Sequence, residues 1–157
     1  MDYINFVPVT GTIINITRGN DCCSQMITLR TDNGIVNFMV DSDTHIIENR
    51  QLRQGMRVVA FYDSSLPVPL IFPPQYRAQI IALLGRNEQV MLNYFDSELV
   101  AGDRSLALNI GRNTMITTVN GQNVTCNIGN QVLLVFYTMT TRSIPPQTTP
   151  DRIVVWC

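Results

Sequence analysis

Apolar and polar residues alternate along most of this chain, and a repeat of two residues is the pattern of a β-strand. Over residues 35–40, for example, Val36, Phe38 and Val40 fall on one face of the expected strand and Asn37 falls on the other. Turn-forming residues separate the alternating stretches, and no segment has the pattern of a long amphipathic helix. The pattern therefore predicts an all-β protein.

The first half of the chain carries five predicted strands. We place them at residues 9–16, 26–31, 35–40, 56–62 and 77–84, with a continuation of the third at 44–47. Asp32-Asn33-Gly34 predicts a tight turn, because Asn and Gly tolerate positive φ, and Gly11 predicts a bulge or a close approach of two backbones. Residues 66–74 contain four prolines and so cannot form a central strand.

The second half has the same pattern with less definition. Its predicted strands cover residues 90–95, 98–100, 106–110, 115–119, 132–137 and 152–156. Ala101-Gly102-Asp103 and Asn120-Gly121 are turn signals. Residues 85–88 form a linker too short to let two modules move freely.

The two halves repeat one order of residues, which points to an internal duplication. The first half holds Thr44, Ile46, Gly55, Phe61-Tyr62, Pro73-Pro74-Gln75 and Ile80-Ile81. The second half holds, in the same order, Thr114, Ile116, Gly129, Phe136-Tyr137, Pro145-Pro146-Gln147 and Ile153-Val154. The shift is 114 − 44 = 70 residues at the threonines and 145 − 73 = 72 at the prolines. We expect two closely packed modules, residues 1–85 and 86–157.

Five strands, an early glycine and a connector before the fourth strand favour a five-stranded OB-type barrel in each module. The first module resembles bacterial OB-fold domains at Gly11-Thr12-Ile13, Thr44-His45-Ile46 and Gly55-Met56-Arg57-Val58. The second lacks the Gly-x-Ile opening. The whole chain is also similar to small clostridial-type bacterial proteins with paired Pro-Pro-Gln or Pro-x-Gln segments, a resemblance that implies no activity. A single β-sandwich is the alternative fold.

The amino-acid composition excludes some classes of reaction and partner. The 157 residues include no lysine, 11 arginines and 12 acidic residues, for a net charge of −1. Schiff-base and phosphate-loop chemistry that needs lysine is thereby excluded, and a nucleic-acid partner is not expected without clustered positive charge. The low net charge is compatible with self-association. Without a basic, apolar leader or a membrane-spanning run, we expect a cytoplasmic protein that does not enter a membrane.

Aromatic residues surround the two Pro-Pro-Gln segments, which fall between the predicted fourth and fifth strands. We select as candidate ligand contacts Tyr62, Phe72, Tyr76, Arg77 and Tyr137. Proline beside aromatic rings makes a rigid apolar surface that can stack on sugars, bases or a peptide. The same prolines could instead serve only the fold, by withholding backbone donors from an edge strand and by adopting cis peptide bonds.

The remaining polar groups give no catalytic pattern. Asp41-Ser42-Asp43-Thr44 could hold a hard cation or a sugar, or could be a turn capped by its own side chains. His45, the single histidine, has no evident orienting partner. Cys22 and Cys23 are adjacent, and we expect them and the other two cysteines to be reduced thiols; a bridge between Cys126 and Cys157 would require two strand ends to meet.

These observations lead to a functional expectation. We expect a non-enzymatic binding or assembly module, without a cofactor or a metal, that contacts a protein or polymer surface or forms a homo-oligomer. The alternative is a binder of oligosaccharides or single-stranded nucleic acid through the loops between strands four and five. A small enzyme or metal protein would depend only on His45, the nearby aspartates and the cysteines.

Overall fold

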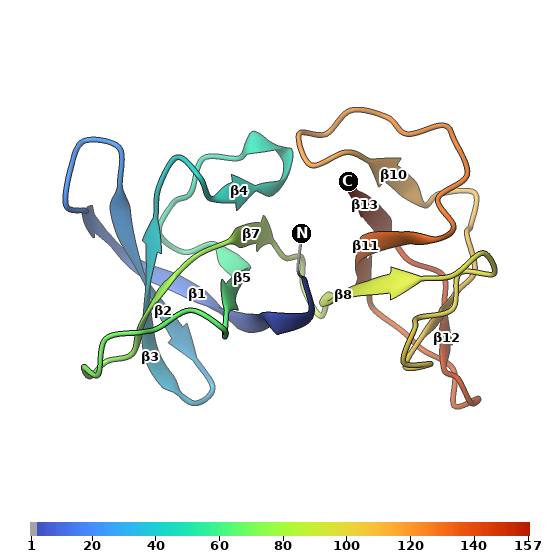
Figure 1. The fold of residues 1–157 in the computed structure, drawn as a ribbon, viewed down its shortest axis with the longest axis horizontal. Helices are drawn as coiled ribbons and strands as arrows, with labels where there is room; N and C mark the ends of the chain where they lie inside the picture. The colour runs from blue at the N-terminus through green and yellow to red at the C-terminus, as the bar shows by residue number, and fades with distance from the viewer. Residues whose placement is uncertain (1–2) are drawn as a thin grey trace. The chain divides into compact units, whose positions relative to one another are not determined.

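The computed structural model describes residues 3–157, and within them the chain is all-β with no α-helix. Two short 3-10 turns are present, η1 (Tyr3–Asn5) and η2 (Ile47–Asn49). The chain separates into two compact units, with the boundary between Gly85 and Arg86 (Figure 1). Each unit has its own hydrophobic core. Residues 1 and 2 of the expected first module lie outside the described residues.

Seven strands build one sheet in the first unit. In chain order they are β1 (Phe6–Arg18), β2 (Gln25–Thr31), β3 (Gly34–Val40), β4 (His45–Ile46), β5 (Arg57–Asp63), β6 (Gln75–Arg77) and β7 (Ile80–Leu83). Their order across the sheet is β4-β7-β5-β1-β2-β3-β6, so the sheet is open and not the closed barrel that the sequence predicts. The expected third and fifth strands are each interrupted, at residues 41–44 and 78–79.

The core of the first unit follows the alternation in the sequence. Ile27 and Leu29 of β2 and Phe38 of β3 are completely buried, whereas their neighbours along the strands are partly accessible or exposed. Strand β5 lies between β1 and β7 and buries four consecutive residues, Val58 to Phe61. The tight turn predicted at residues 32–34 is confirmed, because Thr31 of β2 pairs with Gly34 of β3.

Gly11 is a point of close backbone approach. A Cβ atom there would lie 2.7 Å from the carbonyl oxygen of Arg30 on β2. The bulge that the sequence allowed at Gly11 lies further along β1, where the register with β2 shifts between Ile13 and Asn15.

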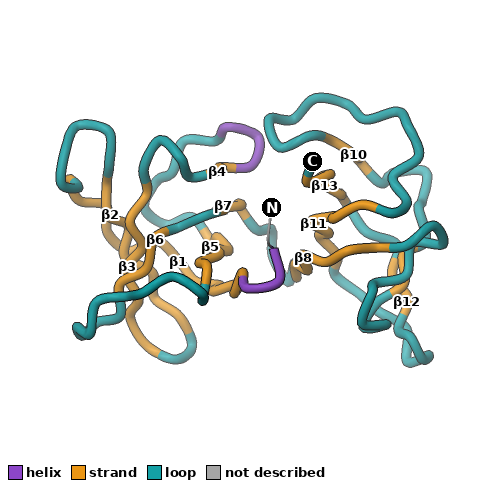
Figure 2. The backbone as a smooth tube through the Cα atoms, in the orientation of Figure 1, coloured by secondary structure: helices purple, strands orange, loops and turns teal. Residues whose placement is uncertain are grey.

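The second unit has fewer and shorter strands. They are β8 (Gln89–Phe95), β9 (Ala107–Leu108), β10 (Met115–Thr117), β11 (Gln131–Tyr137), β12 (Gln147–Thr148) and β13 (Arg152–Trp156). Four of them form a sheet in the order β10-β13-β11-β8, and β12 pairs with β9. Long loops and turns connect these strands (Figure 2).

The strand predicted at residues 98–100 is wrong: this segment is a turn with an isolated bridge at Val100. The Asp96 carboxylate accepts hydrogen bonds from the backbone N–H groups of Glu98 (2.9 Å) and Val100 (3.0 Å). Those donors are thereby turned away from a strand ladder. The predicted strand at 106–110 is likewise reduced to Ala107 and Leu108.

The strand pairing of the first unit recurs in the second. β3 runs parallel to β6 with Asn37 opposite Gln75, and β9 runs parallel to β12 with Ala107 opposite Gln147. β4 and β7 are also parallel, as are β10 and β13. The paired residues differ by 107 − 37 = 70 and 147 − 75 = 72, which are the shifts found in the sequence.

Candidate functional site

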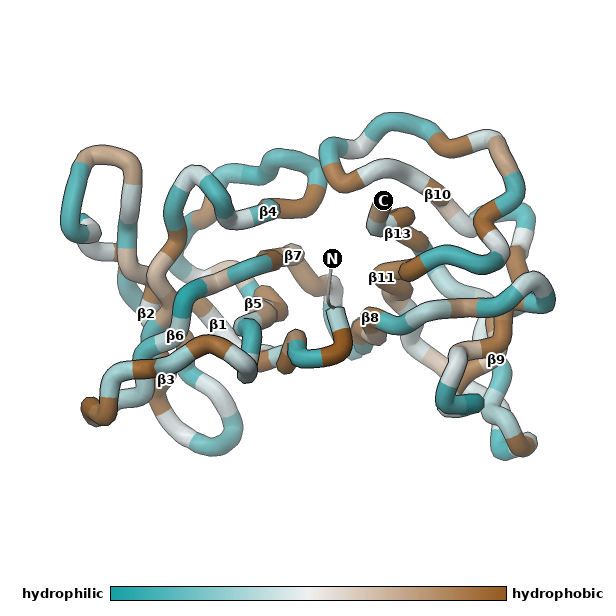
Figure 3. Tube along the Cα trace, in the orientation of Figure 1, coloured by the Kyte–Doolittle hydropathy of each residue, from teal (hydrophilic) through white to brown (hydrophobic). Residues whose placement is uncertain are grey.

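The loop between β5 and β6 projects from the first unit, and its tip is strongly hydrophobic (Figure 3). Residues 66–72, which we call the apolar loop, read Leu-Pro-Val-Pro-Leu-Ile-Phe. Leu70 is 100% exposed and Phe72 is 92% exposed, and Leu66, Val68 and Ile71 are also among the exposed large apolar side chains. The loop ends in a cis peptide bond between Phe72 and Pro73. Five large apolar side chains are therefore presented to solvent by seven consecutive residues.

A pocket of about 270 Å³ lies at the base of this loop, and we call it the tyrosine pocket. It is lined by Tyr62, Asp63, Leu66, Pro67, Val68, Tyr76 and Arg77. The rings of Tyr62 and Tyr76 are stacked, with centroids 3.9 Å apart and planes 10° apart, and both contact the buried Phe38. Each tyrosine therefore has one ring face covered by the other tyrosine.

The positive charge of Arg77 at the rim of the tyrosine pocket is paired with two carboxylates. The Nε of Arg77 lies 3.2 Å from Oδ2 of Asp41, and its Nη2 lies 3.2 Å from Oδ2 of Asp43. Burial, and after it the neighbouring Tyr76, raises the pKa of the Tyr62 phenol above 10.0. Arg77 thus closes the turn after β3, and Tyr62 stays neutral at physiological pH.

Side-chain hydrogen bonds cap the turn at residues 41–44. The Asp41 carboxylate accepts a hydrogen bond from the Asp43 N–H (2.9 Å), and the Thr44 hydroxyl accepts one from the Asp41 N–H (3.1 Å). The capped turn is confirmed, and its carboxylates hold Arg77. Among residues 3–157, no group of three or more histidine, cysteine or acidic side chains is placed to hold a metal ion.

The five selected contact residues lie in three different places. Tyr62, Tyr76 and Arg77 meet at the tyrosine pocket, whereas Phe72 lies on the exposed loop and does not line that pocket. Tyr137 is only 8% exposed and packs in the core of the second unit, where burial raises its pKa. Tyr137 therefore offers no exposed face for stacking.

The second unit has a cavity at the corresponding place, beside the end of β11 and β12. Its volume is about 320 Å³, and its lining residues are Asn109, Thr138, Met139, Thr140, Thr141, Gln147, Thr148 and Thr149. Apart from Met139, the lining side chains are polar and uncharged, whereas Asp63 and Arg77 line the tyrosine pocket. Ile144, in the loop that leads to β12, is 98% exposed and precedes a second cis proline.

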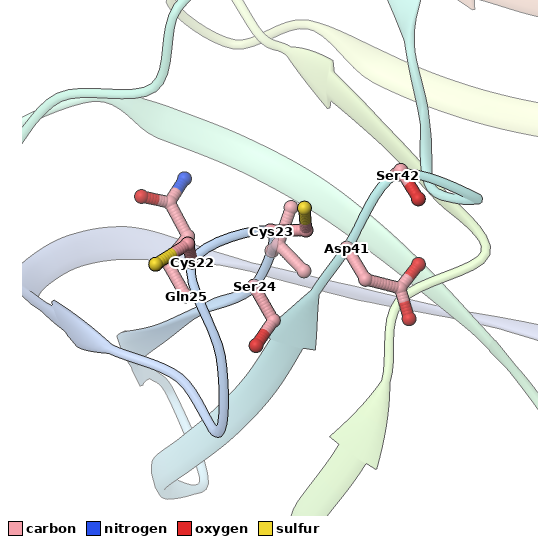
Figure 4. A pocket seen from close by; sticks show the side chains of 7 residues that line it. Cys22, Cys23, Ser24, Gln25, Asp41 and Ser42 are labelled. Atoms are coloured by element: carbon pink, nitrogen blue, oxygen red, sulfur yellow. The ribbon is translucent and has the colours of Figure 1, made fainter.

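The adjacent cysteines line a third, more polar pocket of about 260 Å³ (Figure 4). Cys22 and Cys23 point their sulfur atoms in different directions, and the side chain of Asp41 lies on the far side of the pocket. Both are free and exposed, as are Cys126 and Cys157, so the bridge between the last two is not formed. The side chain of His45 is exposed, and the backbone N–H of His45 donates to the backbone carbonyl of Gln79 (3.0 Å).

Comparison with known proteins gives no further assignment. No protein-family model matches the chain, and no curated protein matches it. Within the described residues, none of the helical segments has the length and apolar character needed to cross a membrane.

Proposed function

We propose that this protein is a non-enzymatic binding or assembly module that contacts another protein through the apolar loop. The observation that carries this proposal is the exposure of five large apolar side chains in residues 66–72. Soluble proteins seldom leave such residues together in water, and a contiguous exposed group of them commonly marks an interaction site.

The chemistry of the loop favours recognition by side chains. Pro67, Pro69, Pro73 and Pro74 have no backbone N–H, so the loop is poorly suited to extend a partner's β-sheet. Residues 64–76 contain no charged side chain, so the contact would depend on apolar packing. Phe72 and Leu70 would serve as anchors that enter a hydrophobic surface of the partner.

Photo-crosslinking in the cells that make the protein tests this proposal. Benzoylphenylalanine in place of Leu70 should give a discrete crosslinked product. The same probe in place of Asn33, which is exposed on the turn between β2 and β3, should not. If neither position captures a protein, the apolar loop is not a protein-binding surface.

We further propose that each unit is an OB-type module derived by duplication. In the first unit, hydrogen bonds bridge both strand interruptions: the Ala78 N–H donates to Met39 O (2.9 Å), and the Thr44 hydroxyl donates to Ala78 O (2.9 Å). Thr114 donates in the same way to Pro150 O (2.7 Å). A cytoplasmic location would keep the four free, exposed cysteines reduced.

A second candidate function is the binding of neutral oligosaccharides through the loops that precede β6 and β12. The uncharged, threonine-rich cavity of the second unit favours it, because hydroxyl and amide groups suit a polyol ligand. Nucleic acid fits less well, since Arg77 is neutralised by two aspartates. Titration with neutral oligosaccharides, followed by amide chemical shifts, should perturb residues 138–149; an unchanged spectrum at millimolar ligand would reject this candidate.

A further inference from the structure

We infer that the partner of the apolar loop is a second copy of this chain, with the loop of each copy seated against the tyrosine pocket of the other. This inference rests on the proposed function and adds the identity of the partner. A symmetric pair of this kind buries the same patch on both copies, so the patch must be complementary to itself.

The first unit presents both halves of such a contact side by side. Leu70 and Phe72 project from the loop, while the stacked Tyr62 and Tyr76 form part of the adjacent pocket. The base of the loop, residues 66–68, is itself a wall of that pocket. The tip remains 100% exposed at Leu70, so the loop does not fill its own pocket. A projection and a socket on one patch are what a twofold contact requires.

The charges near the patch do not oppose a second copy. Arg77 is paired with Asp41 and Asp43, and the Asp63 carboxylate accepts hydrogen bonds from the N–H (2.9 Å) and the hydroxyl (2.6 Å) of Ser65. The net charge of −1 adds little long-range repulsion. An anionic membrane is a poorer match, because it attracts clustered basic residues that this patch lacks.

The exposed area suits a reversible dimer. An aromatic side chain offers about 150–250 Å², so five aliphatic and aromatic side chains at the observed exposures offer on the order of 500 Å². A standard interface uses about 800 Å² per partner. The walls of the tyrosine pocket and the flanking prolines would supply the remainder, and we expect the dimer to dissociate on dilution.

Sedimentation of the purified full chain tests the inference. The wild type should shift from monomer to dimer between about 1 and several hundred micromolar, a range in which modest interfaces dissociate. The double substitution Leu70→Ser and Phe72→Ser should weaken the dimer at least tenfold. Ile144→Ser removes an equally exposed apolar side chain from the second unit and should leave the dimer unchanged. All three chains should have the same circular dichroism spectrum.

A crosslink identifies the contact. Benzoylphenylalanine in place of Leu70, in a mixture of isotopically light and heavy chains, should join light to heavy peptides that contain Tyr62 or Tyr76. A wild type that is monomeric at every concentration, or a dimer that the double substitution leaves intact, overturns the inference. If that monomer is still crosslinked from Leu70 to another protein in cells, the proposed function stands; if it is not, both fail.

Discussion

At the scale of single residues, the fold depends on a few positions where one atom decides whether strands can meet. Gly11 is the clearest, because β1 and β2 approach so closely that a methyl group would contact the Arg30 carbonyl oxygen at 2.7 Å, Thr31 Cγ2 at 3.1 Å and Leu29 Cβ at 3.2 Å. Backbone atoms cannot turn aside as a flexible side chain can. The two strands would have to separate.

Gly11→Ala should therefore lower the free energy of unfolding by about 1–3 kcal/mol, the usual cost of forcing extra volume into a packed site. The shift of the urea midpoint at constant m value measures it. Gly102→Ala is the control, because its new Cβ would lie 3.8 Å from Tyr94 and should change stability by less than about 0.5 kcal/mol. A Gly11→Ala protein as stable as the wild type would contradict this account of β1.

The phenol of Tyr62 makes the stability of the fold depend on pH. Because burial and Tyr76 raise the pKa of its phenol above 10.0 in the folded chain, the folded state holds a proton that the unfolded chain releases. Its contribution to stability should be fully present below pH 10 and should be lost as pH rises through the folded-state pKa. Urea titrations between pH 8 and 11 should show this decline, and Tyr62→Phe should make it shallower. An identical decline in the variant would remove Tyr62 as its source.

At the scale of elements, a threonine after an interrupted strand holds each unit together in the same way. The Thr44 hydroxyl donates to Ala78 O and accepts from the Asp41 N–H, and the Thr114 hydroxyl donates to Pro150 O and accepts from the Gly111 N–H. Each hydroxyl thus connects the turn before β4 or β10 to the chain segment that enters β7 or β13. This explains why the threonine recurs in the sequence while the aspartates do not.

Thr44→Val and Thr114→Val keep the side-chain shape and remove both hydrogen bonds. Each should reduce stability by about 1–3 kcal/mol, because a partly buried carbonyl loses its donor. Thermal unfolding of both variants measures the loss, with Thr10→Val on the exposed side of β1 as the control. A neutral effect at either threonine would contradict the matched roles.

Alternation and turn residues were enough to predict several of the longer strands. The predicted strand at residues 152–156 has the bounds of β13, and those at 26–31 and 35–40 are each within a residue of β2 and β3. Local pattern failed where side chains capture the backbone, as Asp96 does, and where strands are interrupted. It also could not reveal that Arg77 would pair with Asp41 and Asp43, which lie more than thirty residues earlier.

At the scale of the whole molecule, only part of the candidate site could be predicted from the sequence. Sequence reasoning selected Tyr62, Tyr76 and Arg77, and the fold brings them to one pocket. Within residues 66–74 it selected Phe72 and the paired prolines as a surface for stacking, but it did not anticipate the exposure of Leu66, Val68, Leu70 and Ile71. The signal was nevertheless present: five large apolar residues interrupted only by Pro67 and Pro69 are poorly suited to pair in a sheet or to be buried within a loop that short.

The central claim is that another protein covers the apolar loop in the cell, and side-chain footprinting tests this claim most directly. Hydroxyl-radical labelling of Leu70 and Phe72 should be strong in dilute purified protein. In intact cells that make the protein, labelling of these two side chains should be several-fold weaker when it is normalised to Ile144, a reference side chain of similar exposure. Equal labelling of Leu70 and Phe72 in both settings would show that the loop remains in water and would contradict the account.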